Sequence, residues 1–288
     1  MRIVDSQNKI LHGDCVRLMK QFKNSIVDLT VTSPPYDNLR NYHGYSFDFE
    51  GIAKELFRIT KDGGVLVWVV GDATIEGSET GSSFTQALYL KEIGFNLHDT
   101  MIFHKKNPIP QIYRKRYTNV FEYMFVFTKG IAKTHNPLMI DCLHAGLQLN
   151  GTTYKNFSKD TQSRNKLAKP VKNQKIKGNI WEYVVGKSKE DQEAKGHPAP
   201  FPCQLAEDHI LSWTNEGDLV LDPMCGSGTT CKVAKKLGRN FIGMDMSEEY
   251  CKLAESRVEN QDCLFNNLGL SLNSNIHTTK QVSLFGHF

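Results

Sequence analysis

Residues 219–230 read LVLDPMCGSGTT, and this stretch decides how the chain folds. A short apolar run ends at Asp222, a turn containing Gly226 and Gly228 follows, and helix-forming residues continue from Thr229. Glycine lets the backbone turn tightly and approach a ligand closely, and the helix that opens behind the turn offers unpaired N–H groups. The stretch therefore predicts a strand, a ligand-binding turn and the start of a helix.

An acidic residue follows this turn at an informative distance. The next apolar run, residues 240–244, leads into Asp245. An acid at a strand end about 20 residues after the first glycine is where a ribose diol is held. Cys231 stands where a dinucleotide fingerprint has its third glycine, and no Gly-Lys-Ser/Thr is present, so neither a pyrophosphate site nor a P-loop is favoured. A nucleoside cofactor without pyrophosphate suggests S-adenosylmethionine, with Asp222 pairing with its amino group and Asp245 with its ribose.

A second turn is stiffened by two prolines. The apolar, β-branched run 26–31 closes on residues 32–36, which read TSPPY. Consecutive prolines cannot lie inside a helix or a central strand, because each lacks an N–H and has a fixed φ. We therefore expect a strand to end in a rigid turn that presents a hydroxyl, a free carbonyl and an aromatic face. Such a group can hold a planar amine, and a stiff loop without that role is the alternative.

Strand and helix patterns alternate along much of the chain. Strands are expected at residues 27–32, 65–70, 97–103, 120–127, 219–222 and 240–244, with helical spacing at 52–57, 84–88 and 229–237. Residues 61–64 are expected to stop the first helix. The wholly apolar run 65–70 is typical of a strand buried on both faces of a parallel sheet. This alternation predicts a doubly wound α/β fold with a mostly parallel sheet.

The composition is that of a globular protein. The chain has 288 residues, 40% of them hydrophobic and 23% charged, which suits one large domain or two small ones. Because no apolar run has membrane-spanning length and the N-terminus lacks a signal-peptide pattern, we expect neither a membrane protein nor a secreted one. Seven cysteines without a C-x-x-C pair argue against a disulfide framework and a zinc site, and for the cytoplasm. A net charge of +4 favours polyanionic partners only weakly.

Residues 131–196 interrupt the alternation. This region is rich in Lys, Asn, Gln, Ser and Thr, and its basic positions include Arg164, Lys166, Lys169, Lys172, Lys175 and Lys177. A solvated or disordered insertion is one interpretation, and an inserted module that contacts nucleic acid is the other. Trp181 and Tyr183 indicate that the far end of the insertion packs on a folded part of the chain.

Five short motifs occur in one consistent order. They are HGDC at 12–15, TSPPY at 32–36, HPAPFP at 197–202, DPMCGSGTT at 222–230 and GMDMS at 243–247. With these motifs the chain resembles the bacterial amino-group DNA methyltransferases of restriction–modification type. The catalytic motif precedes the cofactor motif, and a basic insertion lies between them, which is the order of the β class of that family. The resemblance covers residues 9–130 and 197–260.

The resemblance implies a Rossmann-like methyltransferase fold with permuted motif order. Residues 1–130 and 197–270 would form the catalytic and cofactor-binding domain, 131–196 the inserted target-recognition region, and 271–288 a C-terminal tail. S-adenosyl-L-methionine would be the cofactor, without a metal. The implied cofactor contacts are Asp14, Cys15, Thr32, His197, Asp222, Pro223, Cys225, Gly226, Ser227, Gly228, Thr229, Thr230, Asp245 and Ser247.

The resemblance also implies the catalytic residues, which are Ser33, Pro34, Pro35 and Tyr36. The Ser33 hydroxyl and the Pro34 carbonyl would accept the two hydrogens of an exocyclic base amine, and Tyr36 would stack on the base. Most of the rate enhancement would then come from positioning and electrostatics. Ser33, in place of the aspartate of many relatives, and the HPAPFP segment resemble the N4-cytosine members. Methylation of adenine N6 is the alternative.

Double-stranded DNA is the implied partner. A target base inside the duplex must be flipped out, at a cost of a few kcal/mol. Basic residues would supply offsetting phosphate contacts, with a solvated loop as the alternative: Lys105, Lys106, Arg114, Lys115, Arg116, Arg164 and Lys166. The segments 104–107 and 113–117 contain no acid. The resemblance further implies a bacterial or phage-encoded protein of the cytoplasm, a cognate restriction endonuclease system and a homodimer.

Other interpretations of single features carry less weight. Pro202-Cys203 matches the dipeptide of ring-carbon cytosine methylation, but it opens a helix with an apolar stripe at Ala206, Ile210 and Trp213. Packing is the expected role of Cys225, Cys231 and Cys251, and strand-end capping is the alternative for Asp28 and Asp72. A catalytically inactive DNA-binding protein with this fold is the remaining functional alternative.

The C-terminal tail carries a separate signal. Residues 272–280 are expected to form a polar linker to residues 281–285, QVSLF, which run from Gln281 to Phe285. This pentapeptide resembles the short peptide by which bacterial proteins dock on the replication sliding clamp. Packing of its Leu-Phe pair on its own domain is the alternative.

Overall fold

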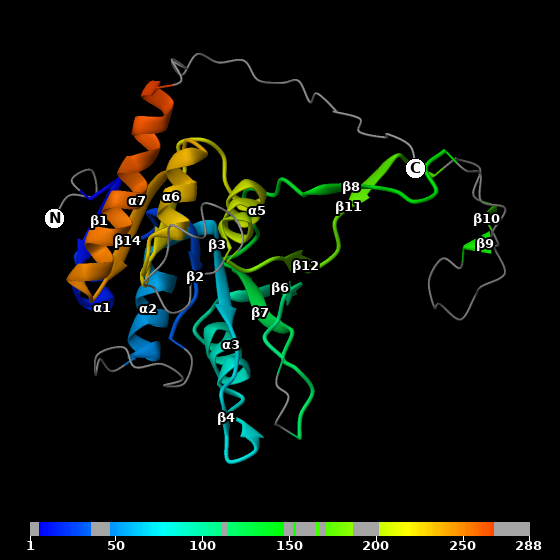
Figure 1. The fold of residues 1–288 in the computed structure, drawn as a ribbon, viewed down its shortest axis with the longest axis horizontal. Helices are drawn as coiled ribbons and strands as arrows, with labels where there is room; N and C mark the ends of the chain where they lie inside the picture. The colour runs from blue at the N-terminus through cyan, green and yellow to red at the C-terminus, as the bar shows by residue number, and fades with distance from the viewer. Residues whose placement is uncertain are drawn as a thin grey trace.

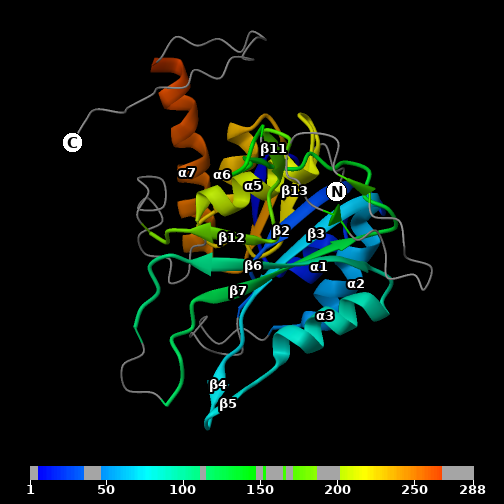
Figure 2. The ribbon, with the colours of Figure 1, turned by 90° about the vertical axis from the view of Figure 1, so that its right-hand side faces the viewer.

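The fold is a central sheet between two layers of helices (Figures 1 and 2). The computed structural model describes residues 6–35, 47–110, 115–146, 152–153, 165–166, 171–186 and 202–267. None of the helices in these ranges has the length and apolar character needed to span a bilayer.

Eight strands form the sheet. In spatial order they are β1 (Lys9–His12), β14 (Asn240–Asp245), β13 (Leu219–Asp222), β2 (Val27–Thr32), β3 (Thr60–Val70), β7 (Phe121–Thr128), β6 (Asn96–Lys105) and β12 (Ile180–Tyr183). The first five are mutually parallel, β7 is antiparallel to both β3 and β6, and β12 is parallel to β6. The expected doubly wound, mostly parallel sheet is therefore confirmed.

Helices cover both faces of the sheet. Figure 2 shows α1 (Cys15–Met19), α2 (Phe49–Ile59) and α3 (Ser82–Glu92) on one side, and α5 (Cys203–Trp213), α6 (Thr229–Lys236) and α7 (Glu248–Asn267) on the other. Residues 65–70 of β3 are all apolar because this part of the strand is buried on both faces. Its residues 65, 67 and 69 belong to the core under α5–α7, whereas residues 66, 68 and 70 belong to the core under α1–α3. The predicted burial on both faces is confirmed.

The two halves of the sequence meet at the centre of the sheet. Val220 and Leu221 of β13 pair with Leu29 and Thr30 of β2. From β2 the chain continues to α2 on one face, whereas from β13 it continues to α6 on the other. Doubly wound sheets bind ligands where the direction of winding changes in this way, at the carboxyl ends of the strands. The fold thus brings the two glycine- and proline-containing turns to one place.

The first helix ends before residues 61–64, as expected, but these residues form part of a strand. Helix α2 ends at Ile59 and β3 begins at once at Thr60, so residues 61–64 lie within a strand instead of a turn. Gly63 adopts a φ of +79°, and its N–H donates to the Lys129 carbonyl at 2.6 Å. A side chain at Gly64 would lie 2.8 Å from the Thr60 methyl group. The two glycines therefore permit close strand packing where the sequence suggested only a break.

The inserted region contributes to the main sheet. Trp181 and Tyr183 of β12 are each 5% exposed, which agrees with the prediction that the far end of the insertion rejoins folded structure. Two further pairs lie in the insertion, β8 (Met139–Asp141) with β11 (Gln174–Ile176) and β9 (Thr152–Thr153) with β10 (Asn165–Lys166). A small hairpin, β4 (Thr74–Ile75) with β5 (Ser78–Glu79), follows β3. The domain boundaries themselves stay predictions.

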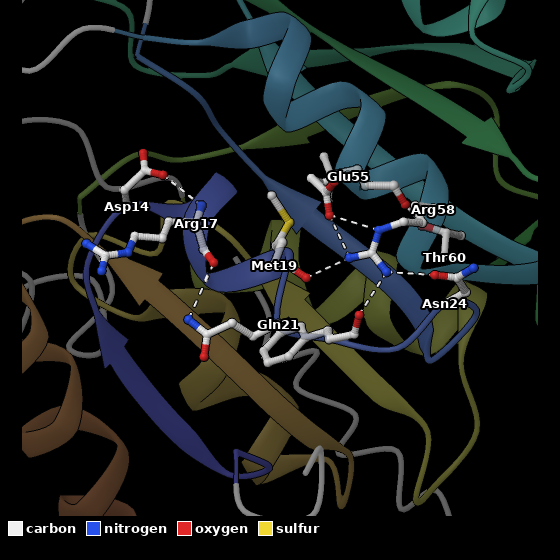
Figure 3. Close-up of polar contacts among 10 residues, drawn as sticks. Asp14, Arg17, Met19, Gln21, Asn24, Glu55, Arg58 and Thr60 are labelled. Carbon is white, nitrogen blue, oxygen red and sulfur yellow. Dashed lines mark hydrogen bonds and ion pairs between the residues drawn. The ribbon is translucent and has the colours of Figure 1, made fainter. Parts of the chain in front are cut away.

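Arg58 fixes the short helix α1 in place (Figure 3). Its guanidinium group donates to the carbonyl oxygens of Met19 and Phe22, at 2.7 and 2.8 Å, and to the Asn24 side chain at 2.7 Å. Glu55, one turn earlier on α2, pairs with it at 2.6 Å. A five-residue helix is not stable alone, and a cation is favourable at its carboxyl end. Arg58 therefore attaches α1 to α2.

We predict that Arg58→Met destabilises the protein by about 2 kcal/mol, because several charged hydrogen bonds are lost while the aliphatic stem is retained. Urea denaturation measures the change. Lys54→Met on the same helix is the control, since the Lys54–Glu50 pair is solvent-exposed and should contribute little. Equal unfolding midpoints for the two variants would contradict the role assigned to Arg58.

Candidate functional site

Four neighbouring strand ends bring the predicted site residues together. Strands β1, β14, β13 and β2 are parallel, so His12, Asp245, Asp222 and Thr32 lie along one edge of the sheet. His12 is directly opposite Asp245, and Asp222 is opposite Gly243. Residues far apart in the sequence thus become neighbours at this edge.

The turn after β13 has the predicted tight form. The Cys225 N–H donates to the Met244 carbonyl at 2.8 Å, and the Gly228 N–H donates to the Cys225 carbonyl at 2.7 Å. Gly228 is the N-cap of α6 with a φ of +76°. A Cβ at Gly228 would lie 2.7 Å from the Cβ of Ala254 in α7. Only glycine satisfies both the backbone conformation and the close approach of α7.

Asp245 binds the turns on either side of it. One carboxylate oxygen accepts from the Gly226 N–H at 2.9 Å, and the other accepts from the Ser247 N–H at 2.8 Å. The His12 ring contacts the Met246 carbonyl through Nε2, at 3.0 Å. Burial raises the pKa of Asp245, and the backbone N–H groups partly offset this effect. The site therefore holds an acid whose charged form would gain from a positive or hydrogen-bond-donating ligand.

Asp222 connects the two turns directly. It is 2% exposed, and its Oδ1 accepts from the Thr32 hydroxyl at 2.8 Å and from the Met224 N–H at 3.2 Å. Burial raises the pKa of Asp222 to about 6, against the lowering effect of its hydrogen bonds. A second link joins the same segments, because the Thr230 hydroxyl donates to the Val31 carbonyl at 3.2 Å. The cofactor turn and the proline turn are thus held together by buried side-chain hydrogen bonds.

Arg257 stabilises the glycine turn through hydrogen bonds to Ser227 and Thr229. This residue was not identified from the sequence. This arginine of α7 is 3% exposed and donates to the carbonyl and hydroxyl of Ser227 and, at 3.3 Å, to the Thr229 hydroxyl. In the sequence, Arg257 cannot be distinguished from the solvent-exposed charged residues of the polar helix α7. The one available signal was its spacing from Ala254 and Val258, which places it on the buried face of α7.

The segment after β1 has a structural role beside its predicted one. Asp14 is the N-cap of α1 and accepts from the Arg17 N–H at 2.7 Å. Gly13 donates to the Asp245 carbonyl at 2.9 Å. Burial raises the pKa of Cys15 to about 12, so its thiol is neutral at physiological pH. The cofactor contacts predicted for Asp14 and Cys15 stay predictions.

The proline turn begins where the sequence placed it. Strand β2 ends at Thr32, which is fully buried, Pro34 is also buried, and Ser33 and Pro35 are partly exposed. Tyr36 and His197 lie outside the described residues. Ser33 is thus at the surface of a turn whose preceding residue is fixed by Asp222. This is a suitable arrangement for holding a small polar group.

The remaining cysteines and aspartates behave largely as expected. Cys225, Cys231 and Cys251 are buried packing residues. Asp72 accepts from the Ser83 N–H at 2.9 Å at the start of α3, so it binds the first turn of a helix instead of capping the end of a strand. Asp28 lies within β2, where it accepts from the Leu219 N–H at 2.9 Å and pairs with Lys61 at 2.6 Å. Cys203 is buried as the first residue of α5, as its helical context indicated.

Several basic residues predicted to contact DNA are ion-paired within the protein. Lys105 pairs with Glu122 at 2.6 Å, and Lys106 pairs with Glu182 at 3.0 Å. The Arg116 guanidinium contacts Glu79 and donates to the Gly77 carbonyl. The segments 104–107 and 113–117 contain no acidic residue, but strands β7, β12 and β5 supply Glu122, Glu182 and Glu79 as partners. A phosphate contact by these three residues would have to compete with the internal pairs.

The other predicted DNA contacts are less defined. Lys115 is exposed, whereas Arg114 and Arg164 lie outside the described residues. Lys166 belongs to β10, and only its backbone is described. In the described part of the chain there is no group of three or more His, Cys, Asp or Glu residues that could hold a metal ion.

We predict a pH-dependent effect of Asp222→Asn on stability. Because the pKa of Asp222 is higher in the folded state, the folded protein binds this proton more tightly and loses stability as pH rises from about 4 to about 6. The variant lacks this cost, so its stability relative to the unmodified protein should rise over that window by an amount on the order of 3 kcal/mol.

Urea denaturation at several pH values measures the difference. Asp62→Asn is the control, because the Asp62 side chain is 92% exposed. Parallel stability curves for Asp222→Asn and the unmodified protein would contradict the raised pKa.

Comparison with known proteins agrees with this geometry. The sequence model of the DNA methylase family matches residues 27–256. The orphan methyltransferase M.BamHII of Bacillus amyloliquefaciens is 53% identical over 255 residues, which cover 86% of this chain and 91% of the relative. The type II methyltransferase M.HinfI of Haemophilus influenzae is 28% identical over 283 residues, covering 89% and 69% of the two chains.

Solved structures show the same fold. The PvuII DNA methyltransferase, described as cytosine-N4-specific, superposes with a TM-score of 0.65 at 21% identity, over 90% of this chain and 91% of that one. The complex of M1.HpyAVI with S-adenosylmethionine superposes with a TM-score of 0.56 at 27% identity, over 89% and 100%. The family match spans both the proline turn and the glycine turn. This chain therefore belongs to the DNA methylase family and is an S-adenosylmethionine-dependent DNA amino-methyltransferase.

Proposed function

We propose that this enzyme methylates the exocyclic N4 of cytosine at a specific sequence in duplex DNA. The observation that carries the proposal is the bond from the Thr32 hydroxyl to Asp222, at 2.8 Å. It attaches the turn that begins with Ser33 to the strand that ends at the cofactor turn. A base amine held at Ser33 would therefore lie beside the cofactor.

The residues at the sheet edge suit S-adenosylmethionine. This cofactor carries an amino group and a ribose diol but no phosphate, and the edge supplies one buried and one partly buried carboxylate without a phosphate-binding lysine motif. Asp222 would hold the amino group, and Asp245 would hold the ribose. A cation beside either carboxylate offsets the burial that raises their pKa values. When bound, S-adenosylmethionine supplies an electrophilic methyl group on its sulfonium sulfur.

The protein's contribution to methyl transfer is the positioning of the amine. The Ser33 hydroxyl and the Pro34 carbonyl would accept its two hydrogens, which turns the nitrogen lone pair away from the base ring. The direction of the Pro34 carbonyl is restricted because Pro35 follows it. Thr32, held by Asp222, fixes the start of the turn. Positioning of this kind supplies a large part of the rate enhancement without a strong general base.

Two further contacts rest on the sequence resemblance. Tyr36 would stack on the flipped base, and His197 would lie near the methionine end of the cofactor. A homodimer, a cognate endonuclease and sliding-clamp docking through Gln281–Phe285 also stay predictions. The last of these segments lies outside the described residues.

The choice of cytosine rests on Ser33 and the HPAPFP segment. We predict that plasmid DNA incubated with the enzyme and S-adenosylmethionine gains N4-methylcytosine, as detected by mass spectrometry of nucleosides. Ser33→Ala should slow methyl transfer about 100-fold, because one acceptor for the amine is lost, with little change in cofactor affinity. The appearance of N6-methyladenine alone would contradict the assignment and support the adenine alternative.

Ser78→Ala is the matched control for this experiment. Ser78 is an exposed residue of β5, and its hydroxyl donates to the carbonyl of the neighbouring Glu79 at 3.2 Å. Its substitution should leave the methylation rate unchanged. Equal rates for Ser33→Ala and Ser78→Ala would remove Ser33 from the reaction.

Arg257 provides a test of the cofactor turn. We predict that Arg257→Met weakens S-adenosylmethionine binding about tenfold or more, because the turn at Ser227 and Thr229 loses its buried support. Isothermal titration calorimetry measures the affinity, and circular dichroism checks folding. Lys252→Met on the exposed face of α7 is the control. Unchanged affinity in a folded Arg257→Met variant would contradict the supporting role.

A further inference from the structure

A two-stranded ribbon of the inserted region extends away from the sheet (Figure 1). Strands β8 and β11 are antiparallel, with Asp141 opposite Gln174, Ile140 opposite Lys175 and Met139 opposite Ile176. All six residues are exposed. The exposed fractions of Met139, Ile140 and Ile176 are 47%, 38% and 58%. Apolar residues on a narrow, exposed ribbon indicate a contact surface more than a folding core.

Both strands of the ribbon are attached to the same helix. Before β8, the Asn136 N–H donates to the Ser212 carbonyl at 2.8 Å at the end of α5. After β11, Lys177 pairs with Asp208 of α5 at 3.2 Å, and its N–H donates to the Leu138 carbonyl at 2.8 Å. Isolated two-stranded ribbons are only marginally stable. These contacts with α5, at the base of the ribbon, therefore stabilise it.

The base is polar and largely buried. Asp208 is 7% exposed and also accepts from the Tyr183 hydroxyl at 2.7 Å and from the Gln204 side chain at 2.8 Å. The Lys177 ammonium lies 4.6 Å from the centre of the Trp181 ring. Because the Asp208 carboxylate binds Lys177, Tyr183 and Gln204 together, the position of its side chain is restricted. The ribbon is therefore held in a defined direction by the catalytic domain while its own two faces stay exposed.

The two faces of the ribbon differ in chemistry. Paired residues share a face, so Asp141, Gln174, Met139 and Ile176 lie on one side, whereas Ile140 and Lys175 lie on the other. The Gln174 amide donates to Asp141 at 3.2 Å. The first face can therefore form hydrogen bonds and apolar contacts with base edges. The second carries a lysine suited to a phosphate, and Lys172 just before β11 is also exposed.

We propose that the β8–β11 ribbon enters the major groove of duplex DNA and reads the target sequence with the face that carries Gln174 and Asp141. The proposal rests on the proposed function, because it takes DNA as the substrate. A two-stranded ribbon has the width of the B-DNA major groove. Glutamine binds adenine bidentately there, aspartate accepts from the cytosine amino group, and apolar side chains contact the thymine methyl group.

Cys142 allows a direct test with the unmodified enzyme. This free cysteine immediately follows β8 and is partly exposed, whereas Cys15, Cys203, Cys225, Cys231 and Cys251 are buried. We expect saturating duplex DNA to slow alkylation of Cys142 by iodoacetamide at least fivefold, as measured by peptide mass spectrometry. Fluorescence anisotropy confirms that the DNA is bound. An unchanged rate at saturation would overturn the proposal.

Substitutions separate the two faces. Lys175→Gln should lower the slope of log affinity against log salt by about one, as expected for one lost phosphate contact. Lys91→Gln is the matched control, since Lys91 is an exposed lysine at the far end of α3. Gln174→Ala should relax discrimination at one base pair of the site about tenfold or more, as mapped by modified-base sequencing. Unchanged salt slope and unchanged site together would overturn the proposal.

These outcomes are distinguishable from failure of the proposed function. If the enzyme methylates DNA but Cys142 is not protected and neither variant differs from its control, only the ribbon proposal is wrong. If no methylated base forms on any DNA, the proposed function fails. Protection of Cys142 that rises with protein concentration in the absence of DNA would assign the ribbon to a contact between two copies of the chain and overturn the proposal.

Discussion

The pairing of β2 with β13 is the constraint on which the rest of this structure depends. It joins residues separated by about 190 positions and sets the ends of two parallel strands side by side. The hydrogen bond from Thr32 to Asp222 then connects the proline turn, which we propose holds the amine, to the glycine turn, which we propose holds the cofactor. Asp28 strengthens the same junction from the opposite end of β2, because it binds both Leu219 and Lys61. Methyl transfer needs two ligands in one fixed geometry, and with the proposed roles of the two turns this junction would set that geometry.

The site obtains its rigidity from polar groups that are costly to bury. Asp222 and Arg257 are buried and Asp245 is partly buried, and each has several hydrogen-bonding partners in the adjoining turns. A buried charge with specific partners has few alternative arrangements. Burial raises the pKa of both aspartates, because it disfavours their charged forms. If these residues hold the cofactor as proposed, its positive charge would favour the charged forms.

Charge is arranged differently on the side of the molecule expected to face DNA. Lys105, Lys106 and Arg116 are ion-paired with acidic partners on β7, β12 and the β4–β5 hairpin. No acidic residue lies near these cations in the sequence, which suggested that they are unpaired. Strand pairing places Glu122 and Glu182 beside Lys105 and Lys106. We propose that DNA recognition uses other groups as well. The proposed ones lie on the β8–β11 ribbon of the inserted region, whose base is attached to α5 by the Lys177–Asp208 pair.

The sequence by itself determined the fold class, the strand ends at Thr32, Asp222 and Asp245, and the two turns, because these depend on local periodicity and on the backbone limits of proline and glycine. The continuation of β3 through residues 61–64 was not predictable, since a glycine pair indicates a turn until a neighbouring strand occupies the space. The role of Arg257 and the ion-pair partners of Lys105 and Lys106 were not predictable from the sequence either. Only the tertiary structure decided which charges are paired and which support the site, because their partners come from distant segments that meet only when the sheet assembles.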